Sequence, residues 1–217
     1  MNLFNNSAKK LLIGAIASLL ISNSFAATKI TEGTDYTIIA SPQSAPNSNG
    51  KISVMEFFSY SCIHCATLDP LIEKWKASPA AKNVTLQKIQ IVWEGSLIGY
   101  AKLNATIEAL NLQRISTPAF NAIMNERKDL QDIKQLKAFL TTQKVDIPKF
   151  MAVYNSFAID AKTKEYASLT KKYNIMGTPT VIVNNQYQVS PAQPARIMEI
   201  TQALVDKSLA SNNTKKK

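Results

Sequence analysis

The sequence is short of the residues that disulfide frameworks, zinc sites and disordered chains require. Its 217 residues include two cysteines, one histidine, 6 glycines and 9 prolines, and 18% of them are charged. Two cysteines cannot cross-link a small secreted scaffold, and two thiols with one histidine fall short of the roughly four ligands of a structural zinc. With 46% apolar residues, the composition is typical of a globular domain with a substantial core.

The first 26 residues contain no acidic side chain and are typical of a secretory signal peptide. Lys9 and Lys10 precede an apolar run from Leu11 to Ile21, and the small residues Ser24 and Ala26 follow it. This run is about half the roughly 20 residues that a membrane-spanning helix needs. We therefore expect cleavage after Ala26 and an exported, soluble product. No cysteine directly follows the run, so we expect no lipoprotein anchor.

Basic residues outnumber acidic ones, 25 against 15, which gives a formal net charge of +10. The lysines are scattered along the chain, apart from the tail at residues 215–217. A nucleic-acid surface would need a basic stripe with interleaved aromatic residues, and no segment shows one. We therefore interpret the charge as solvated surface and expect no nucleic-acid partner.

Hydrophobic patterns predict a mixed sheet that is interrupted by a helical block. Residues 52–58 are almost continuously apolar, which indicates a strand covered on both faces. Thr117 before Pro118, and Asp146 before Pro148, predict two helix starts. We expect strands at 36–39, 52–58 and 84–92, and a hairpin of two further strands at 180–183 and 187–189. Helices are expected at 62–77 and 194–208, and about five short helices should fill residues 97–173. The fold class is therefore α/β, with helices on both faces of the sheet.

Both cysteines lie in one Cys-x-x-Cys, between a buried strand and a helix. The motif allows a redox dithiol, half of a metal site, or an inert structural disulfide. The count of ligands disfavours a metal site, because His64 is the chain's one histidine and lies between the two cysteines. A disulfide between Cys62 and Cys65 would close a loop of only a few residues, where the entropic stabilisation is smallest. The redox dithiol is the favoured interpretation.

The position of the motif assigns different roles to the two thiols. Cys62, at the start of a helix, faces unpaired N–H groups and the positive end of the helix dipole, which favour a thiolate nucleophile. Cys65 lies one turn inside the helix and should stay buried and protonated until it resolves a mixed disulfide. A cationic His64 would stabilise only the reduced form, and this would make the disulfide a stronger oxidant.

These residues resemble the DsbA thiol oxidases of the bacterial periplasm. The resemblance is carried by residues 54–65, Val-Met-Glu-Phe-Phe-Ser-Tyr-Ser-Cys-Ile-His-Cys, and by residues 177–189, which begin Gly-Thr-Pro. It implies a thioredoxin-like fold in two parts, residues 27–94 and 166–217, with an inserted all-helical domain at 95–165. The resemblance implies a lowered pKa for Cys62 and an oxidising disulfide, as in DsbA proteins. We predict the direction of this pKa shift and not its size.

The resemblance also implies partners and a location. Such a protein would donate the disulfide of Cys62 and Cys65 to reduced, unfolded proteins newly exported to the periplasm. A quinone-linked membrane protein of the DsbB type would reoxidise it, and no cofactor or metal beyond the disulfide is expected. One residue departs from the family pattern, because members commonly have proline where this chain has Ile63. The dipeptide Ile63-His64 sets the redox potential, so this departure affects the expected oxidising strength.

Two further pairs of residues match family positions. The resemblance implies a cis peptide bond before Pro179, which would turn the backbone of Thr178 toward an extended substrate. Glu56 and Lys88 are charged residues on otherwise apolar strand faces, where an ionisable group is costly unless it is paired or used. They match a buried acid and its lysine partner in the family. The pair could relay a proton to Cys65 or act as a structural ion pair.

Two rival functions remain open. A disulfide isomerase or reductase could use the same dithiol, although about twenty-five residues before the first core strand are too few for a dimerisation domain. A periplasmic carrier could instead hold a soft ion such as Cu(I) between Cys62 and Cys65. We expect a monomer, because no long amphipathic extension is present.

Overall fold

The computed structural model describes residues 29–40, 50–93 and 95–214 of the chain. The predicted signal peptide at residues 1–26 lies outside the described residues, and so does most of the loop expected at 41–50. Within the described ranges, no helix has both the length and the apolar character needed to cross a membrane.

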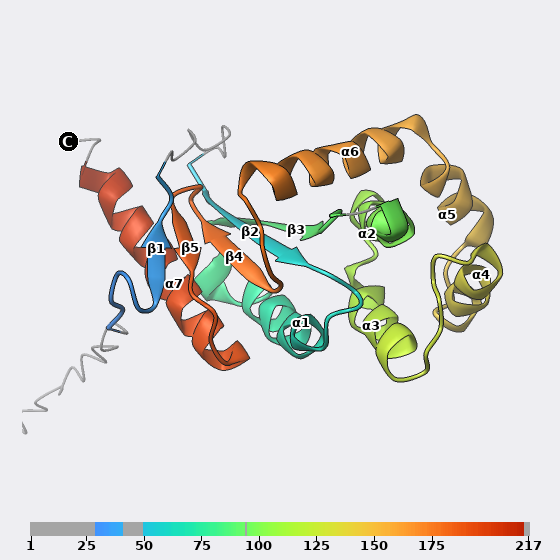
Figure 1. The fold of residues 1–217 in the computed structure, drawn as a ribbon, viewed down its shortest axis with the longest axis horizontal. Helices are drawn as coiled ribbons and strands as arrows, with labels where there is room; N and C mark the ends of the chain where they lie inside the picture. Colours follow the sequence, from blue (N-terminus) through green and yellow to red (C-terminus); the bar gives the residue numbers. More distant parts are fainter. Residues whose placement is uncertain (1–28, 41–49, 94, 215–217) are drawn as a thin grey trace, which may run out of the picture.

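A mixed five-stranded sheet forms the centre of the fold (Figure 1). Strands β2 and β3 run parallel, and the remaining neighbours in the sheet pair antiparallel. The predicted mixed sheet and hairpin are confirmed. Strand β3 ends two residues earlier than expected, because its partner β2 ends at Phe58, whose carbonyl accepts the N–H of Ile91 at 2.8 Å. In spatial order the strands are β1 (Tyr36–Ile38), β5 (Tyr187–Val189), β4 (Thr180–Val183), β2 (Ile52–Phe58) and β3 (Val84–Gln90).

Helices cover both faces of this sheet, as the pattern of β2 predicts (Figure 1). Alternate residues of a strand point to opposite faces. Ile52 and Val54 pack in one core with residues of α1 (Ile63–Lys76) and α7 (Pro194–Thr214). Met55 and Phe57 pack in a second core on the other face, with residues of α2 (Ile98–Ala109) and α6 (Phe157–Lys172). By the same alternation Glu56 shares the face of Val54, toward α1.

Five α-helices form the predicted helical block. They are α2 (Ile98–Ala109), α3 (Ser116–Met124), α4 (Ile133–Thr142), α5 (Ile147–Tyr154) and α6 (Phe157–Lys172). Short 3-10 turns occur at Pro79–Ala81, Gly95–Leu97 and Gln113–Ile115. The core of the block also takes in Phe58, Tyr60 and Cys65, so it is continuous with the end of β2 and the start of α1. Helix α6 runs unbroken across residue 165, and the domain boundary there stays a prediction.

The two predicted helix starts have different outcomes. Asp146 is the N-cap of α5, and its carboxylate accepts the N–H of Lys149 at 3.0 Å. The prediction for Thr117 is wrong, because α3 already begins at Ser116 with Ile115 in the N-cap position. The Thr117 hydroxyl donates instead to the carboxylate of Asp69 on α1. The Thr117 side chain therefore binds the buried carboxylate of Asp69 instead of capping its own helix.

Helix α7 ends at Thr214, six residues beyond the predicted end at Ser208. The polar residues of this last segment have a local means of satisfying their side chains. The hydroxyls of Ser208 and Ser211 each donate to the carbonyl four residues earlier, at 2.8 and 3.0 Å. Because no glycine or proline follows Ser208 within the helix, nothing in the segment stops it.

Leu68 and Leu71 offer a matched test of the packing of α1. Leu68 is 0% exposed in the core beneath the sheet, whereas Leu71 on the same helix is 37% exposed. We expect Leu68→Ala to lower the free energy of unfolding by about 2–5 kcal/mol, through lost burial and the cavity left behind. Leu71→Ala should cost less than about 1 kcal/mol. Urea denaturation of both variants measures the difference, and equal losses would show that α1 does not pack through Leu68.

Candidate active site

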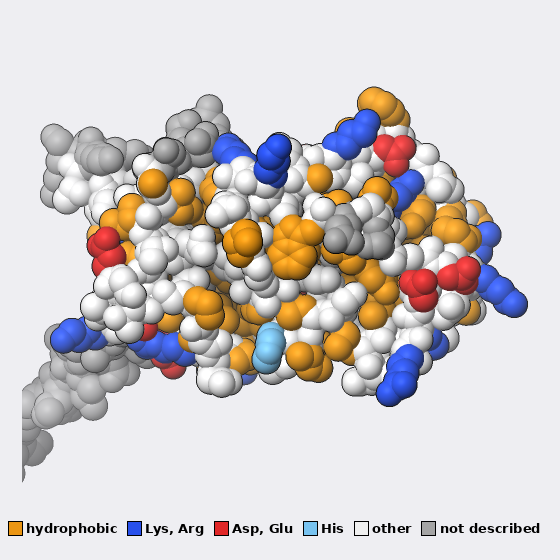
Figure 2. Space-filling view, in the orientation of Figure 1, with side chains coloured by type: hydrophobic (Ala, Val, Ile, Leu, Met, Phe, Trp, Pro, Cys, Tyr) orange, Lys and Arg blue, Asp and Glu red, His pale blue; other side chains and the backbone are white. Residues whose placement is uncertain are grey.

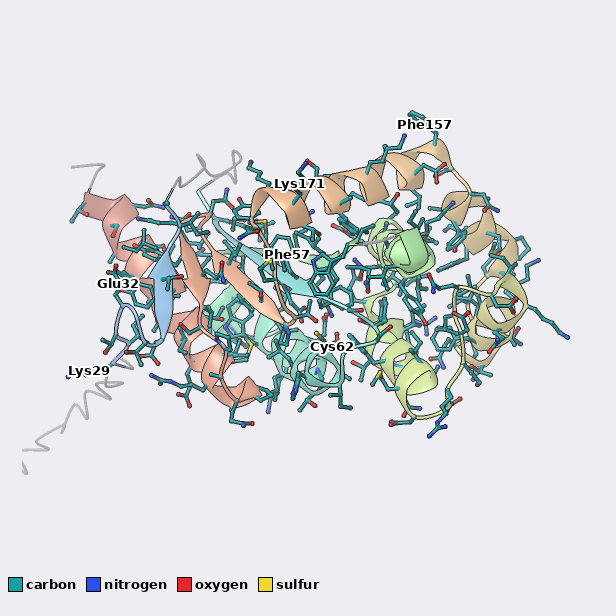
Figure 3. All side chains as sticks on the ribbon, in the orientation of Figure 1. Lys29, Glu32, Phe57, Cys62, Phe157 and Lys171 are labelled. Atoms are coloured by element: carbon teal, nitrogen blue, oxygen red, sulfur yellow. The ribbon has the colours of Figure 1, made fainter. Side chains whose placement is uncertain are left out.

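Cys62 lies at the start of α1, just after the loop that follows β2. Its N–H donates to the carbonyl of Ser59 at 3.0 Å, which closes a turn. Cys62 then occupies the N-cap position of α1, and its Sγ accepts the N–H of Cys65 at 3.4 Å. Figure 3 shows Cys62 at the end of α1, where the sheet and the helical block meet. The thiol therefore faces the free N–H groups of the first helical turn.

The two thiols differ in exposure and in acidity. Cys62 is partly exposed and Cys65 is buried, and both are free thiols in this structure. The hydrogen bond from the Cys65 side chain is the largest influence on Cys62. Burial opposes it, but hydrogen bonds with the Thr178 side chain and with the N–H groups of Cys65 and His64 add to it, and the pKa of Cys62 falls to about 5. The same hydrogen bond, together with burial, raises the pKa of Cys65 above its ordinary value.

These pKa shifts give the chemistry that the position in the sequence predicts. At neutral pH Cys62 is a thiolate that solvent can reach, and Cys65 is a thiol held below it. A low-pKa, accessible cysteine beside a second cysteine is the arrangement that thiol–disulfide exchange requires. The arrangement is typical of a redox dithiol.

The dipeptide between the cysteines faces outward. Ile63 is 55% exposed, and His64 is also exposed. The backbone N–H of His64 contributes to the low pKa of Cys62. An influence of the His64 imidazole or of the Ile63 side chain on the redox potential stays a prediction.

The loop before β4 closes over the dithiol. The bond between Thr178 and Pro179 is cis, as the resemblance implied. In its protonated form Cys62 donates to the carbonyl of Thr178, and the two atoms lie 3.3 Å apart across 116 residues of sequence. A groove of about 590 Å³ runs along this loop and is lined by His64, Thr178 and Pro179, among others. We call it the proline groove. The described residues that line it include no Asp, Glu, Lys or Arg.

Glu56 and Lys88 face each other across the parallel strands, but they are not each other's closest partners. They are directly paired in the register of β2 and β3, and Lys88 Nζ lies 4.0 Å from Glu56 Oε2. Lys88 makes its shorter ion pairs with Asp69 and with Glu73, the latter at 3.0 Å. Burial alone would lower the pKa of Lys88, but the three carboxylates outweigh it and hold that pKa above its ordinary value.

Neither Asp69 nor Glu73 is among the residues predicted from the sequence, and Asp69 is the buried one of the two. It is 0% exposed and accepts hydrogen bonds from Lys88 and from the hydroxyls of Ser116 and Thr117. It thereby ties α1 to β3 and to α3. A signal was present in the sequence, because Asp69 lies four residues after Cys65 and next to Leu68 on the buried face of α1. A carboxylate on that face requires a buried partner.

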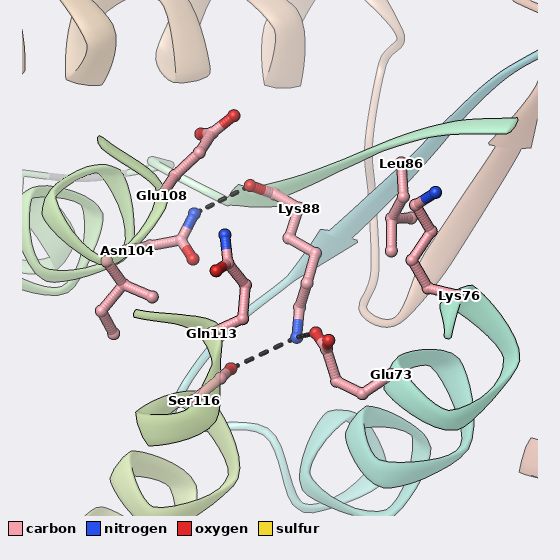
Figure 4. A pocket seen from close by; sticks show the side chains of 9 residues that line it. Glu73, Lys76, Leu86, Lys88, Asn104, Glu108, Gln113 and Ser116 are labelled. Carbon is pink, nitrogen blue, oxygen red and sulfur yellow. Dashed lines mark hydrogen bonds and ion pairs between the residues drawn. The ribbon is translucent and has the colours of Figure 1, made fainter. Parts of the chain in front are cut away.

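Glu56 is the one carboxylate of the cluster with unsatisfied oxygens. Neither oxygen has a hydrogen-bond partner among the described residues. Burial raises the pKa of Glu56 to about 7, the charge of Lys88 opposes the rise, and the negative charges of Asp69, Glu73 and Cys62 add to it. A cavity of about 210 Å³ adjoins the cluster and is lined by Glu73, Lys88, Asn104 and Ser116, among others (Figure 4). Glu56 can therefore gain or lose a proton near neutral pH.

No metal site accompanies the dithiol in the part of the chain that the structure describes. No group of three or more His, Cys, Asp or Glu side chains there could hold a metal ion. The rival hypothesis of a copper carrier needs only the two thiolates of Cys62 and Cys65, and it stays an alternative hypothesis.

Comparison with known proteins gives a consistent result. Residues 53–200 match the family model described as a DSBA-like thioredoxin domain. The thiol:disulfide interchange protein DsbA of Burkholderia cepacia is 35% identical over 173 residues, which cover 79% of this chain and 81% of the relative. The DsbA of Pseudomonas syringae pv. tomato is 31% identical over 201 residues, 90% of this chain and 92% of the relative.

Solved structures extend this similarity to the fold. The oxidoreductase NmDsbA1 from N. meningitidis superposes with a TM-score of 0.75 at 32% identity and covers 84% of this chain and 96% of its own. Pseudomonas aeruginosa DsbA superposes with a TM-score of 0.77 at 28% identity and covers 85% of this chain and 97% of its own. The thioredoxin-like sheet with its helical insertion is thus shared along nearly the full length of these structures.

The low pKa of Cys62 predicts a pH-dependent stability of the reduced protein. A group with a lower pKa in the folded than in the unfolded chain stabilises the fold above its unfolded pKa, and this effect is lost as the pH falls through the folded pKa. For Cys62 these values are the ordinary thiol value of 9.0 and about 5. We expect the free energy of unfolding of the reduced protein, minus that of Cys62→Ala, to rise from pH 5 to pH 9. Denaturation under reducing conditions measures it, and a flat difference would contradict the lowered pKa.

Proposed function

The chain belongs to the DsbA family of thiol:disulfide oxidoreductases, and from this premise we propose that it donates a disulfide between Cys62 and Cys65 to reduced polypeptides. One observation carries the proposal. The accessible Cys62 is held as a thiolate by donors around it, while its partner Cys65 is buried and protonated. The reduced form is therefore stabilised over the oxidised form, and this drives electrons from the substrate to the enzyme.

The reaction proceeds through a mixed disulfide at Cys62. A substrate thiolate attacks Sγ of Cys62 in the oxidised enzyme, a substrate–Cys62 bond forms, and the Cys62–Cys65 bond breaks. Cys65 leaves as a thiolate and takes up a proton. A second substrate thiolate then attacks the substrate sulfur of the mixed disulfide and releases Cys62 as a thiolate. Two electrons pass from the substrate dithiol to the enzyme disulfide, which becomes a dithiol, and the stable Cys62 thiolate is a good leaving group.

Substrate recognition relies on the backbone around Thr178. A carbonyl turned toward Cys62 beside a cis proline offers a pairing site to an extended polypeptide. No Asp, Glu, Lys or Arg is among the described residues that line the proline groove, so no such side chain there selects substrates by charge. These features favour a broad range of unfolded substrates.

The cellular setting follows from the same role. We propose that the chain is exported through its signal peptide at residues 1–26 and acts as a monomer in the periplasm, where newly exported proteins are reduced and unfolded. A quinone-linked membrane protein of the DsbB type would return the dithiol to the disulfide state. The alternative, an isomerase or reductase, uses the same thiol–disulfide exchange. It differs because the cell would keep Cys62 and Cys65 reduced, whereas an oxidant is kept as the disulfide.

Glu56 and Lys88 serve this cycle as a proton relay. Cys65 must gain a proton when it leaves the disulfide and lose it on reoxidation. Glu56 exchanges its proton near pH 7, and its charge interacts with Cys62. Lys88 stabilises the charged form of Glu56 from 4.0 Å, and the cavity beside Lys88 gives water access to the cluster.

Disulfide transfer tests the main proposal. We expect the oxidised protein to convert a reduced, unfolded two-cysteine polypeptide to its disulfide form in a one-to-one reaction. Cys65→Ser cannot form the enzyme disulfide, so it should not oxidise this polypeptide. When its Cys62 is first loaded with glutathione as a mixed disulfide, a one-cysteine polypeptide should displace glutathione and accumulate as a covalent complex through Cys62, because no Cys65 thiol is present to release it. Cys62→Ser should form no such complex. Non-reducing electrophoresis and mass spectrometry measure both products. Rearrangement of a scrambled substrate that outpaces oxidation of a reduced one would favour the isomerase instead.

A pH profile tests the relay. Glu56→Gln removes the group that titrates near pH 7, so the rate of disulfide transfer should lose its inflection at that pH. The matched control is Glu73→Gln, which removes a carboxylate from the same lysine and should keep the inflection. Stopped-flow fluorescence between pH 5 and 9 measures both variants. An unchanged inflection in Glu56→Gln would leave only a structural role for the Glu56–Lys88 pair.

A further inference from the structure

A second hollow adjoins the proline groove and has no role in the chemistry described above. Its volume is about 620 Å³, and it lies among the segment after β3, the last turns of α6 and the segment before β4. Its lining includes Val92, Trp93, Ala167, Lys171, Ile175 and Met176. We call it the Trp93 hollow. Asn174 and Met176 line both the hollow and the proline groove, so the two are neighbours on one surface.

The walls of the hollow expose large apolar side chains. Trp93 is 51% exposed and Met176 is 82% exposed. Figure 2 shows hydrophobic side chains gathered on the face that carries the pale-blue histidine. The tryptophan is also held in place, because its Nε1 donates to the carbonyl of Ile175 at 2.9 Å. A fixed, half-open aromatic ring beside an exposed methionine is suited to bind a further apolar group.

The hollow lies within reach of a polypeptide attached to Cys62. Thr178, whose carbonyl contacts Cys62, is two residues from Met176 in the chain. An extended polypeptide advances about 3.3 Å per residue. A side chain roughly two to four positions from the reacting cysteine therefore spans the distance from Thr178 past Met176. The mixed disulfide at Cys62 therefore holds a substrate side chain close to the Trp93 hollow.

The charge of the hollow narrows the choice of occupant. Lys171 is the charged residue among the described side chains that line it, and no acidic side chain is among them. A lysine or arginine of the substrate would be repelled by Lys171. An aromatic or long aliphatic side chain would bury apolar area against Trp93 and Met176.

We propose that the Trp93 hollow is a specificity pocket that binds a large apolar side chain of the same polypeptide that reacts at Cys62. The inference rests on the proposed function, since the mixed disulfide tethers the occupant. It adds a selective element to a groove that otherwise accepts any backbone. Substrate cysteines with an apolar residue a few positions away are oxidised faster than those surrounded by small polar residues.

A peptide series tests the pocket. Each peptide carries one cysteine in a glycine–serine background, with phenylalanine placed at one position from five before to five after it. The measured quantity is kcat/KM for attack on the oxidised protein, relative to the peptide without phenylalanine. In the wild type we expect one or two positions to give a gain of roughly 5–20-fold, as partial burial of a large apolar side chain provides.

Variants of the protein then test whether this gain in kcat/KM depends on Trp93. Trp93→Ala should reduce it to less than about twofold, and Trp93→Phe should restore most of it, because an apolar ring remains. The matched control is Phe157→Ala, which removes an 84% exposed aromatic residue at the other end of α6 and should keep the wild-type gain (Figure 3). Each gain is the ratio of kcat/KM for two peptides measured on the same variant, so a general loss of activity in that variant does not change it.

Three results would overturn the proposal. The first is an equal gain in Trp93→Ala and the wild type, and the second is the absence of a preferred position in the wild type. The third is a change of oligomeric state in Trp93→Ala with an unaltered peptide preference, which would assign the hollow to a second copy of the chain. Failure of the phenylalanine-free peptide to form a mixed disulfide at all would instead contradict the proposed function.

Discussion

The site depends on the burial of Cys65 directly beneath a partly exposed Cys62. Cys65 belongs to the core that joins the end of β2 to the helical block, and its exposure is 0%. A thiol in that setting keeps its proton and gives it as a hydrogen bond to the sulfur one turn earlier. This hydrogen bond from Cys65 is the largest of the influences that lower the pKa of Cys62. The core that joins the end of β2 and the start of α1 to the helical block also makes the two thiols different, and the redox chemistry depends on that difference.

The charged cluster behind the dithiol follows from the same burial. A buried ammonium needs a partner, and Lys88 has Asp69 and Glu73 close by. Glu56, the third carboxylate, lies 4.0 Å from Lys88 and accepts no hydrogen bond from the described residues, so burial raises its pKa to about 7 although the charge of Lys88 opposes the rise. Asp69 also receives the hydroxyls of Ser116 and Thr117. The cluster thus fastens the insertion to α1 and leaves one carboxyl that titrates near neutral pH.

The sequence predicts those parts of the molecule that rest on local patterns. The alternation in β2, the N-cap carboxylate of Asp146 and the position of Cys62 before a helix are readable because neighbouring residues determine them. Thr117 shows where such prediction ends, because its hydroxyl has a local use as a cap and a distant use as a donor to Asp69. Only the tertiary structure decides between the two. The pairing of Lys88 with Asp69, and the meeting of Trp93 with Met176, likewise depend on segments that are far apart in the chain.

The departure of Ile63 from the family's proline can now be understood physically. The backbone N–H groups that lower the pKa of Cys62 are those of His64 and Cys65. Either residue at position 63 leaves both groups in place, so the thiolate keeps its backbone donors. What changes is the surface, because the Ile63 side chain is 55% exposed beside the reactive sulfur. A substitution at this position therefore keeps both backbone donors and changes the exposed surface beside Cys62. Its effect on the redox potential stays a prediction.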